Sequence, residues 1–223
     1  MKVLGILGSP HGRKGSTGKL LSLVLEGADE AGAETGIISL SETTVLPCNA
    51  CDTCHRSGKC PLPDDFATAK ERMLAADGVI LASPNYMLNV SAYMKAFMDR
   101  CSSIVHCKML EGKFGAGVVS SGSGEDEEVV KILLRFLNAC GMQAVGAVNA
   151  RSEGIGKLAS EKEVTKRAVS LGREIVKAIE EKRAYPEQAE FLKSHAERMK
   201  SLITMRKDDW PFEYEYWQKK ERR

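Results

Sequence analysis

The sequence predicts an α/β fold in which a parallel sheet is covered by helices on both faces. Short apolar runs alternate five times with longer amphipathic stretches over residues 1–182. The runs are almost continuously apolar, as expected for strands that are buried on both faces. Because connections between parallel strands are right-handed, this alternation favours a doubly wound sheet that binds ligands at the carboxyl ends of its strands.

Each expected element follows from a local pattern. The five strands are expected at the apolar runs Val3–Leu7, Ile37–Leu40, Gly78–Ala82, Phe114–Val119 and Ala144–Val148. Helices are expected where apolar residues recur at helical spacing, over residues 16–31, 91–105, 125–140 and a long stretch that ends near 182. A further helix runs to about Ala76 and is expected to be capped by Asp64 or Asp65.

Composition and charge exclude several classes of function. The 223 residues are 43% hydrophobic and 28% charged, and the formal net charge is only +2. This balance is ordinary for a globular protein and indicates neither nucleic acid nor a membrane as a partner. No apolar run approaches the roughly 20 residues that span a bilayer. The first residues are typical of a strand rather than a signal peptide, so we expect a cytoplasmic protein.

The chain is expected to divide into a main domain, 1–182, with a cysteine-rich insertion at 47–63, and an extension, 183–223. The extension begins with an amphipathic helix over Pro186–Lys207. Aromatic residues then fall on alternate positions of Trp210–Trp217, so an extended segment would present them on one face. Such large apolar side chains need cover, either at a subunit interface or by packing on their own domain.

The loop after the first strand has the features of a phosphate site. It reads GSPHGRKGST and offers glycines, the start of a helix, and hydroxyls at Ser9, Ser16 and Thr17. Free N–H groups and the helix dipole favour an anion at such a position. The loop matches neither the P-loop nor the dinucleotide fingerprint. The alternative is a plain strand-to-helix loop in which Ser16 is the N-cap.

Four of the seven cysteines lie within thirteen residues, at the spacing Cys48-x2-Cys51-x2-Cys54-x5-Cys60. Four thiolates in one compact loop suit a [4Fe–4S] cluster. Zinc more often uses two separated pairs, and unoccupied thiols or disulfides remain alternatives. The other three cysteines are expected to be buried structural residues: Cys101, Cys107 and Cys140. His106 adjoins one of them, but neighbouring helical residues point apart and favour no shared metal site.

These loops resemble those of the NADPH-dependent FMN reductase-like flavodoxin family. GSPHGRKGSTGKLL looks like the family's GSPR…GNT phosphate loop, with His11 where arginine is common and Ser16 where asparagine is common. The segment Ser83–Arg100 resembles the family's SPxY…S…K…DR stretch. We expect surface or interface ion pairing from its polar residues Lys95, Asp99 and Arg100.

The resemblance implies FMN and the residues that bind it. The phosphate would be held by Ser9, His11, Ser16 and Thr17. The ring would lie along Pro84, Asn85, Tyr86, Met87 and Leu88. The SSGSG loop after the fourth strand is on the expected rim of the site, through Ser121, Gly122 and Gly124.

The cysteine pattern resembles that of the iron–sulfur flavoprotein branch, whose members carry FMN and one [4Fe–4S] cluster. The resemblance implies a flavodoxin-like three-layer α/β/α sandwich with strand order 2-1-3-4-5, and a homodimer or homotetramer. Ferredoxin or NAD(P)H would be the electron donor and a quinone-like molecule the acceptor. Two alternatives are an NAD(P)H-dependent FMN or quinone reductase that lacks a cluster, and a zinc-stabilised binding module with no redox activity.

Overall fold

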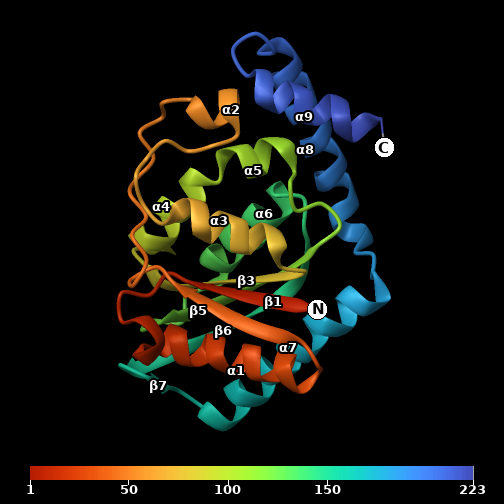
Figure 1. Ribbon diagram of the computed structural model, residues 1–223. Helices are drawn as coiled ribbons and strands as arrows, with labels where there is room; N and C mark the ends of the chain where they lie inside the picture. Colours follow the sequence, from red (N-terminus) through yellow and green to blue (C-terminus); the bar gives the residue numbers. More distant parts are fainter. Residues whose placement is uncertain (223) are drawn as a thin grey trace.

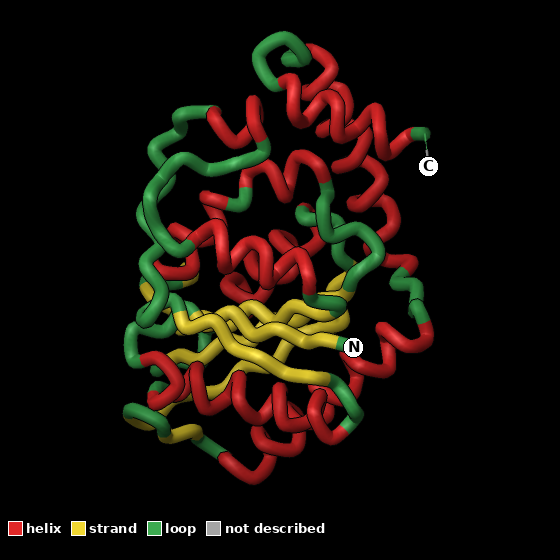
Figure 2. The backbone as a smooth tube through the Cα atoms, viewed as in Figure 1, coloured by secondary structure: helices red, strands yellow, loops and turns green. Residues whose placement is uncertain are grey.

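The computed structural model of the chain describes residues 1–222. Its long strands form one parallel sheet in the order β2 (Glu34–Ser39), β1 (Lys2–Leu7), β3 (Gly78–Tyr86), β5 (Phe114–Ser121) and β6 (Gln143–Gly154). Figure 2 shows this sheet as one twisted layer between helices. The order confirms the predicted 2-1-3-4-5 arrangement when only the long strands are numbered.

Two short strands lie beyond the carboxyl ends of the parallel sheet. β4 (Asn89–Val90) pairs antiparallel with β3, and β7 (Lys157–Leu158) pairs antiparallel with β6. Residues 1–222 therefore contain seven strands, and the prediction of five was wrong in number. Each added strand is the short return arm of a hairpin, which is too brief to register as an apolar run.

Helices cover both faces of the sheet (Figure 1). One face is covered by α1 (Ser16–Glu30) and α7 (Glu161–Glu181). The other is covered by α3 (Phe66–Ala75), α4 (Ala92–Arg100), α5 (Ser102–Cys107) and α6 (Glu127–Ala139). A 3-10 turn, η1 (Gly12–Lys14), precedes α1. The single helix expected over 91–105 is two helices, because the chain turns at Cys101.

The two covered faces have separate hydrophobic cores, one on each side of the sheet. Between α1 and α7 the backbones touch through glycines. A methyl group at Gly172 would lie 1.9 Å from the carbonyl oxygen of Val24, and one at Gly27 would lie 2.1 Å from that of Val169. This approach fixes α1, and with it the loop that precedes α1, against the rest of the domain.

The C-terminal extension forms two helices, α8 (Pro186–Met205) and α9 (Pro211–Glu221). Gln188 at the start of α8 bonds both the N–H and the carbonyl of Ala144 on β6, at 2.8 Å each. Figure 1 shows the chain then leading along α8 to the far side of the helical layer, where α9 lies beside α5 and the short helix α2 (Thr53–Ser57).

The prediction of an extended aromatic segment was wrong, because α9 is a helix. Glu213 and Trp217 form its buried face, together with Trp210, the N-cap residue that precedes the helix. Pro211 occupies the first helical position, which suits proline. Trp217 Nε1 donates to the carbonyl oxygen of His106 at 3.1 Å. The two tryptophans therefore pack on their own chain, which is one of the two arrangements expected for these aromatic residues.

No helix within residues 1–222 combines the length and apolar character needed to cross a bilayer.

Candidate functional site

A cavity of about 280 Å³ opens at the carboxyl ends of the parallel strands. Nine of the twelve predicted flavin-site residues line it: Ser9, His11, Ser16, Thr17, Pro84, Asn85, Tyr86, Ser121 and Gly122. The remaining three, Met87, Leu88 and Gly124, are not among the lining residues. Four residues were missed by the sequence analysis and complete the wall: Ser120, Ser152, Gly154 and Ile155.

The loop after β1 winds tightly at the start of α1. Gly12 has a φ of +53°, and a methyl group at Gly15 would lie 2.9 Å from His11 Cβ and 3.0 Å from Ser9 Oγ. The first N–H groups of a helix have no acceptor within the helix, and here they begin at the wall of the cavity. A compact loop with free N–H groups and a positive helix end fits a phosphate.

The hydroxyls of this loop have distinct partners. Thr17 Oγ1 and Ser120 Oγ, both buried, are 2.7 Å apart and join the loop to the end of β5. Ser16 Oγ is 2.8 Å from Ser152 Oγ and donates to the carbonyl oxygen of Gly154 at 2.7 Å. Ser16 is not the N-cap, which is Gly15, so the plain-loop alternative fails on this point.

The opposite wall is formed by the β3–β4 hairpin. Asn85 Nδ2 donates to the carbonyl oxygen of Glu125 at 2.7 Å, which ties the hairpin to the segment before α6. At the tip, Met87 and Leu88 have φ values of 51° and 60°. Two successive residues with positive φ form the tight turn that two-residue hairpins favour. Both side chains are exposed, Met87 by 96%, so they stand on the rim of the cavity's wall rather than inside it.

A second cavity, of about 160 Å³, is lined by all four clustered cysteines, Cys48, Cys51, Cys54 and Cys60. The structure therefore brings the predicted ligand set to one place. Ala50 and Asp52 have φ values of 54° and 58°, an uncommon conformation for residues with side chains. Turns of this kind direct successive N–H groups to one side, as in many phosphate and iron–sulfur sites. Hydrogen bonds from Thr53 lower the pKa of the Cys51 thiol, which favours the thiolate that binds metal.

A buried ion pair supports this loop. The Arg100 guanidinium donates to the two Asp64 oxygens at 2.6 and 3.1 Å, and its Nε donates to Cys60 Sγ at 3.2 Å. Burial opposes the charge of Asp64, but the bonds from Arg100 and two backbone N–H groups hold the pKa of its carboxyl below the usual range. The prediction of surface pairing was right for Lys95 and Asp99, at 2.6 Å, and wrong for Arg100, which is 3% exposed.

Comparison with known proteins identifies the family of the chain. Residues 1–154 match the family described as NADPH-dependent FMN reductase. The chain belongs to this family. An iron-sulfur flavoprotein of Archaeoglobus fulgidus is 36% identical over 99% of this chain and 99% of its own length.

Solved structures show the same fold at lower identity. The NAD(P)H:quinone oxidoreductase of Methanothermobacter marburgensis matches with a TM-score of 0.59 and 18% identity, over 83% of this chain and 98% of its own. A flavodoxin from the domain Archaea matches with a TM-score of 0.55 and 14% identity, over 81% of this chain and 99% of its own. This member of the FMN reductase family is thus a flavin-dependent oxidoreductase with a flavodoxin-like fold.

The remaining cysteines of this FMN reductase family member are structural. Cys101, Cys107 and Cys140 are fully buried, as predicted, and burial raises the pKa of each thiol well above its ordinary value. A buried thiol of this kind is inert.

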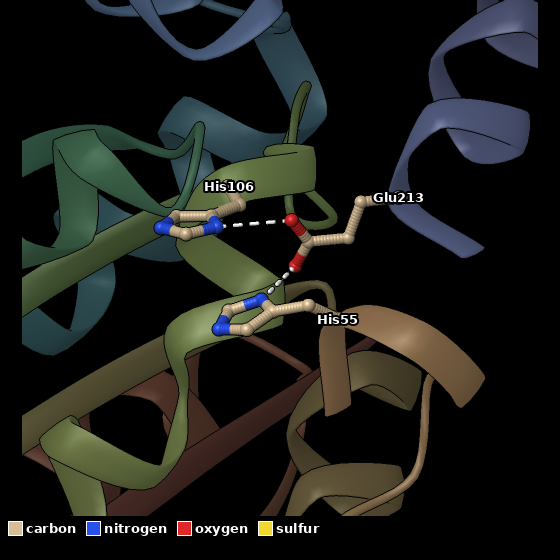
Figure 3. A group of neighbouring side chains, drawn as sticks. All are labelled: His55, His106 and Glu213. Atoms are coloured by element: carbon tan, nitrogen blue, oxygen red, sulfur yellow. Dashed lines mark hydrogen bonds and ion pairs between the residues drawn. The ribbon is translucent and has the colours of Figure 1, made fainter. Parts of the chain in front are cut away.

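One polar group escaped the sequence analysis entirely. Glu213 of α9 lies between His55 of α2 and His106 of α5, and Figure 3 shows the two imidazoles directed at the two oxygens of one carboxylate. His106 bonds Glu213, whereas its neighbour Cys107 is buried in the core. Burial lowers the pKa of His55, whereas hydrogen bonds and charge interactions with Cys54 and Glu213 raise it. The contacts have the larger effect, and the pKa is raised to about 10.

Proposed function

We propose that the protein binds FMN in the cavity at the carboxyl ends of the strands and a [4Fe–4S] cluster in the cysteine loop, and that it transfers electrons between them and external partners. The observation that carries this proposal is the gathering of all four clustered cysteines around one cavity, in a chain of the FMN reductase family whose other cavity opens at the carboxyl ends of the strands. The naming of a full-length relative as an iron-sulfur flavoprotein supports it.

The FMN phosphate would be held by the loop after β1. Thr17 and Ser9 offer hydroxyls there, and the first N–H groups of α1 offer donors. The ring would extend toward Pro84, Asn85 and Tyr86 on one side, and toward Ser121 and Gly122 on the other. The β6–β7 hairpin closes the cavity through Ser152 and Gly154, which Ser16 anchors. Met87, Leu88 and Gly124 remain expected contacts at the rim.

The cysteine loop would hold the cluster by four thiolates. Iron–sulfur clusters need soft ligands in a compact arrangement, and the donor set here consists of such ligands. FMN exchanges one or two electrons and a cluster exchanges one, so together they would connect a one-electron donor to a two-electron acceptor. The protein residues position both groups, and Arg100 places a buried positive charge at Cys60.

Partners and assembly follow from this proposal. We propose ferredoxin or NAD(P)H as the donor and a quinone-like molecule as the acceptor, in a homodimer or homotetramer. Thiolate ligands persist in a reducing compartment, which supports a cytoplasmic location.

The test is quantification of iron, zinc and FMN in anaerobically prepared protein. We expect one FMN and four irons per chain, with a broad absorption shoulder at about 400 nm. Cys54→Ser should lose the iron and keep the FMN, whereas Cys140→Ser, a change in the hydrophobic core, should keep both. FMN without iron in the wild type would instead favour a reductase that lacks a cluster, and one zinc without flavin would favour a non-redox module.

A further inference from the structure

We infer that Glu213, in the C-terminal helix α9, is a positioning residue for the cysteine loop. The extension would then be part of the cofactor site, although it lies about 150 residues along the chain from the cysteines. The inference rests on the proposed cluster for its effect on cofactor binding, but not for its effect on the loop itself.

The contacts of Glu213 are short and fully enclosed. His55 Nδ1 donates to Oε1 at 2.7 Å, and His106 Nδ1 donates to Oε2 at 3.0 Å. The exposed fraction of the Glu213 side chain is zero. Hydrogen bonds from the two imidazoles outweigh burial and lower the pKa of the carboxyl. The Trp210 ring stacks on the His55 ring, at 4.5 Å between centroids. A buried carboxylate with two charge-assisted bonds ties three helices together at one point.

One of these three helices carries a cysteine of the proposed ligand set. α2 spans Thr53–Ser57 and includes Cys54, and His55 is the next residue. Five residues are far too few for a helix that is stable alone. The residue before α2, Asp52, has a positive φ of 58°, which is unfavourable for a residue with a side chain. The order of α2 must therefore come from outside it, through tertiary contacts.

The C-terminal helix supplies contacts to the middle of α2 and to its C-terminal end. Glu213 bonds His55 in its middle, and the ring of Phe212 lies so close to Gly58 that a methyl group there would be 2.5 Å from the ring atoms. On the far side, α9 is anchored to α5, where Trp217 bonds the carbonyl of His106. Loss of the Glu213 bond should thus free α2 while α9 stays docked.

A metal ion bound by the same three side chains is the competing explanation, since their ligand atoms lie within 4.8 Å of one another. The ring geometry argues against it. The two imidazole planes are only 18° from parallel, with centroids 4.8 Å apart. Nitrogen lone pairs lie in the ring planes, so lone pairs in two nearly parallel planes do not meet at one tetrahedral ion. Each nitrogen instead has its own carboxylate oxygen, which is the arrangement of a hydrogen-bonded bridge.

The test compares Glu213→Gln with Glu215→Gln, an exposed position on the same helix. Glutamine keeps the shape but offers only one acceptor oxygen and removes the charge. In metal-free protein, we expect amide hydrogen exchange over residues 52–58 to accelerate about tenfold or more in Glu213→Gln and not in the control. After anaerobic cluster assembly, we expect iron to be lost to a chelator faster by a similar factor, with a changed cluster reduction potential. FMN content should be unchanged.

Two further measurements keep the outcome clear. Both tryptophans of the chain lie in the extension, so their fluorescence reports whether α9 is still docked. If Glu213→Gln undocks it, His106→Gln, which leaves the His55 bond intact, should show a smaller effect on exchange. Unchanged exchange in a docked Glu213→Gln protein overturns the inference. The inference is also overturned if the protein binds one zinc per chain, keeps it when all four clustered cysteines are changed to serine, and loses it in Glu213→Gln. A wild type without iron overturns the proposed cluster, whereas the exchange result still tests the positioning role.

Discussion

The proposed flavin cavity and the cysteine loop differ in what holds their walls in place. The cavity is lined by the loop after β1 and by the ends of β3, β5 and β6, and these four strands are joined to one another by backbone hydrogen bonds along the sheet. The loop between β2 and α3 contains only the five residues of α2 as regular structure. Its position depends on side chains from distant segments, chiefly Arg100 and Glu213. A sheet thus fixes one site, and a few buried charges fix the other.

This difference has a consequence for mutation. The strands around the cavity are held by many backbone hydrogen bonds. A single side-chain change there should therefore disturb only its own contacts and leave the sheet in place. Each buried ion pair at the cysteine loop is a single support, and removal of one partner leaves the other charged and enclosed. The two sites should therefore be separable, with changes in one leaving the other occupied.

The largest effect is expected from Asp64→Ala. The change leaves Arg100 buried without its partner, which typically costs about 3–5 kcal/mol of folding free energy. We expect urea denaturation to show this loss and iron uptake to fail, while folded protein still binds FMN. The surface pair serves as a control, since Asp99→Ala should cost less than about 1 kcal/mol. Equal loss of FMN and iron would contradict the separation of the two sites.

The converse change is Gly18→Ala in the first turn of α1, next to the loop that lines the cavity. A methyl group there would lie 2.4 Å from the carbonyl oxygen of Gly12, so the phosphate loop must shift. Strain of this kind costs about 1–3 kcal/mol, and we expect FMN affinity to fall about 10- to 100-fold in a fluorescence titration. Glu26→Ala, at an exposed position of the same helix, is the matched control. Iron content should stay at the wild-type value, and a parallel loss of iron would show that the sites are coupled.

A smaller effect is expected from Thr17→Val, which keeps the shape and removes the hydroxyl. Ser120 then loses its buried partner at 2.7 Å, at a cost of about 1–3 kcal/mol, and one candidate phosphate ligand disappears. We expect weaker FMN binding and a lower Tm. Ser22→Ala removes an exposed hydroxyl from the same helix and should change neither. Unchanged FMN affinity in Thr17→Val would exclude this hydroxyl as a phosphate ligand.

Most of the residues that line the cavity could be predicted from the sequence, because its walls follow from strand ends. Ligands of doubly wound sheets bind at the carboxyl edge, and the loops after the first, third and fourth strands all lie there. The wall formed by the β6–β7 hairpin was missed because β6 was expected to end at Val148. The strand continues through polar residues, with Asn149 and Arg151 paired to β5, where the apolar pattern has already stopped. Backbone pairing, which the pattern does not report, carries the strand onward to the hairpin.

The supports of the cysteine loop could not be predicted in the same way. His55 and Glu213 are 158 residues apart, and no spacing rule connects them. One signal was present for α9 itself: Pro211 at a helix start, followed by Glu213 and Trp217 at helical spacing. The alternating aromatic residues pointed to an extended segment instead. Two of them, Phe212 and Tyr216, are half-buried and lie together on another side of the helix, with ring centroids 6.5 Å apart.

The smallest effect is expected at the tip of the β3–β4 hairpin. It tests whether the proposed flavin site depends only on residues held by the sheet. Met87 is almost fully exposed and contributes nothing to the wall of the cavity in a single chain. If the ring contacts only the walls, Met87→Ala should change FMN affinity by less than about twofold, because surface substitutions rarely exceed about 0.5 kcal/mol. A larger loss, measured by the same titration, would mean that the tip closes over bound flavin. In that case the pocket would be completed by a side chain that the sheet does not hold, and the flavin site would share the dependence on single side chains that distinguishes the cysteine loop.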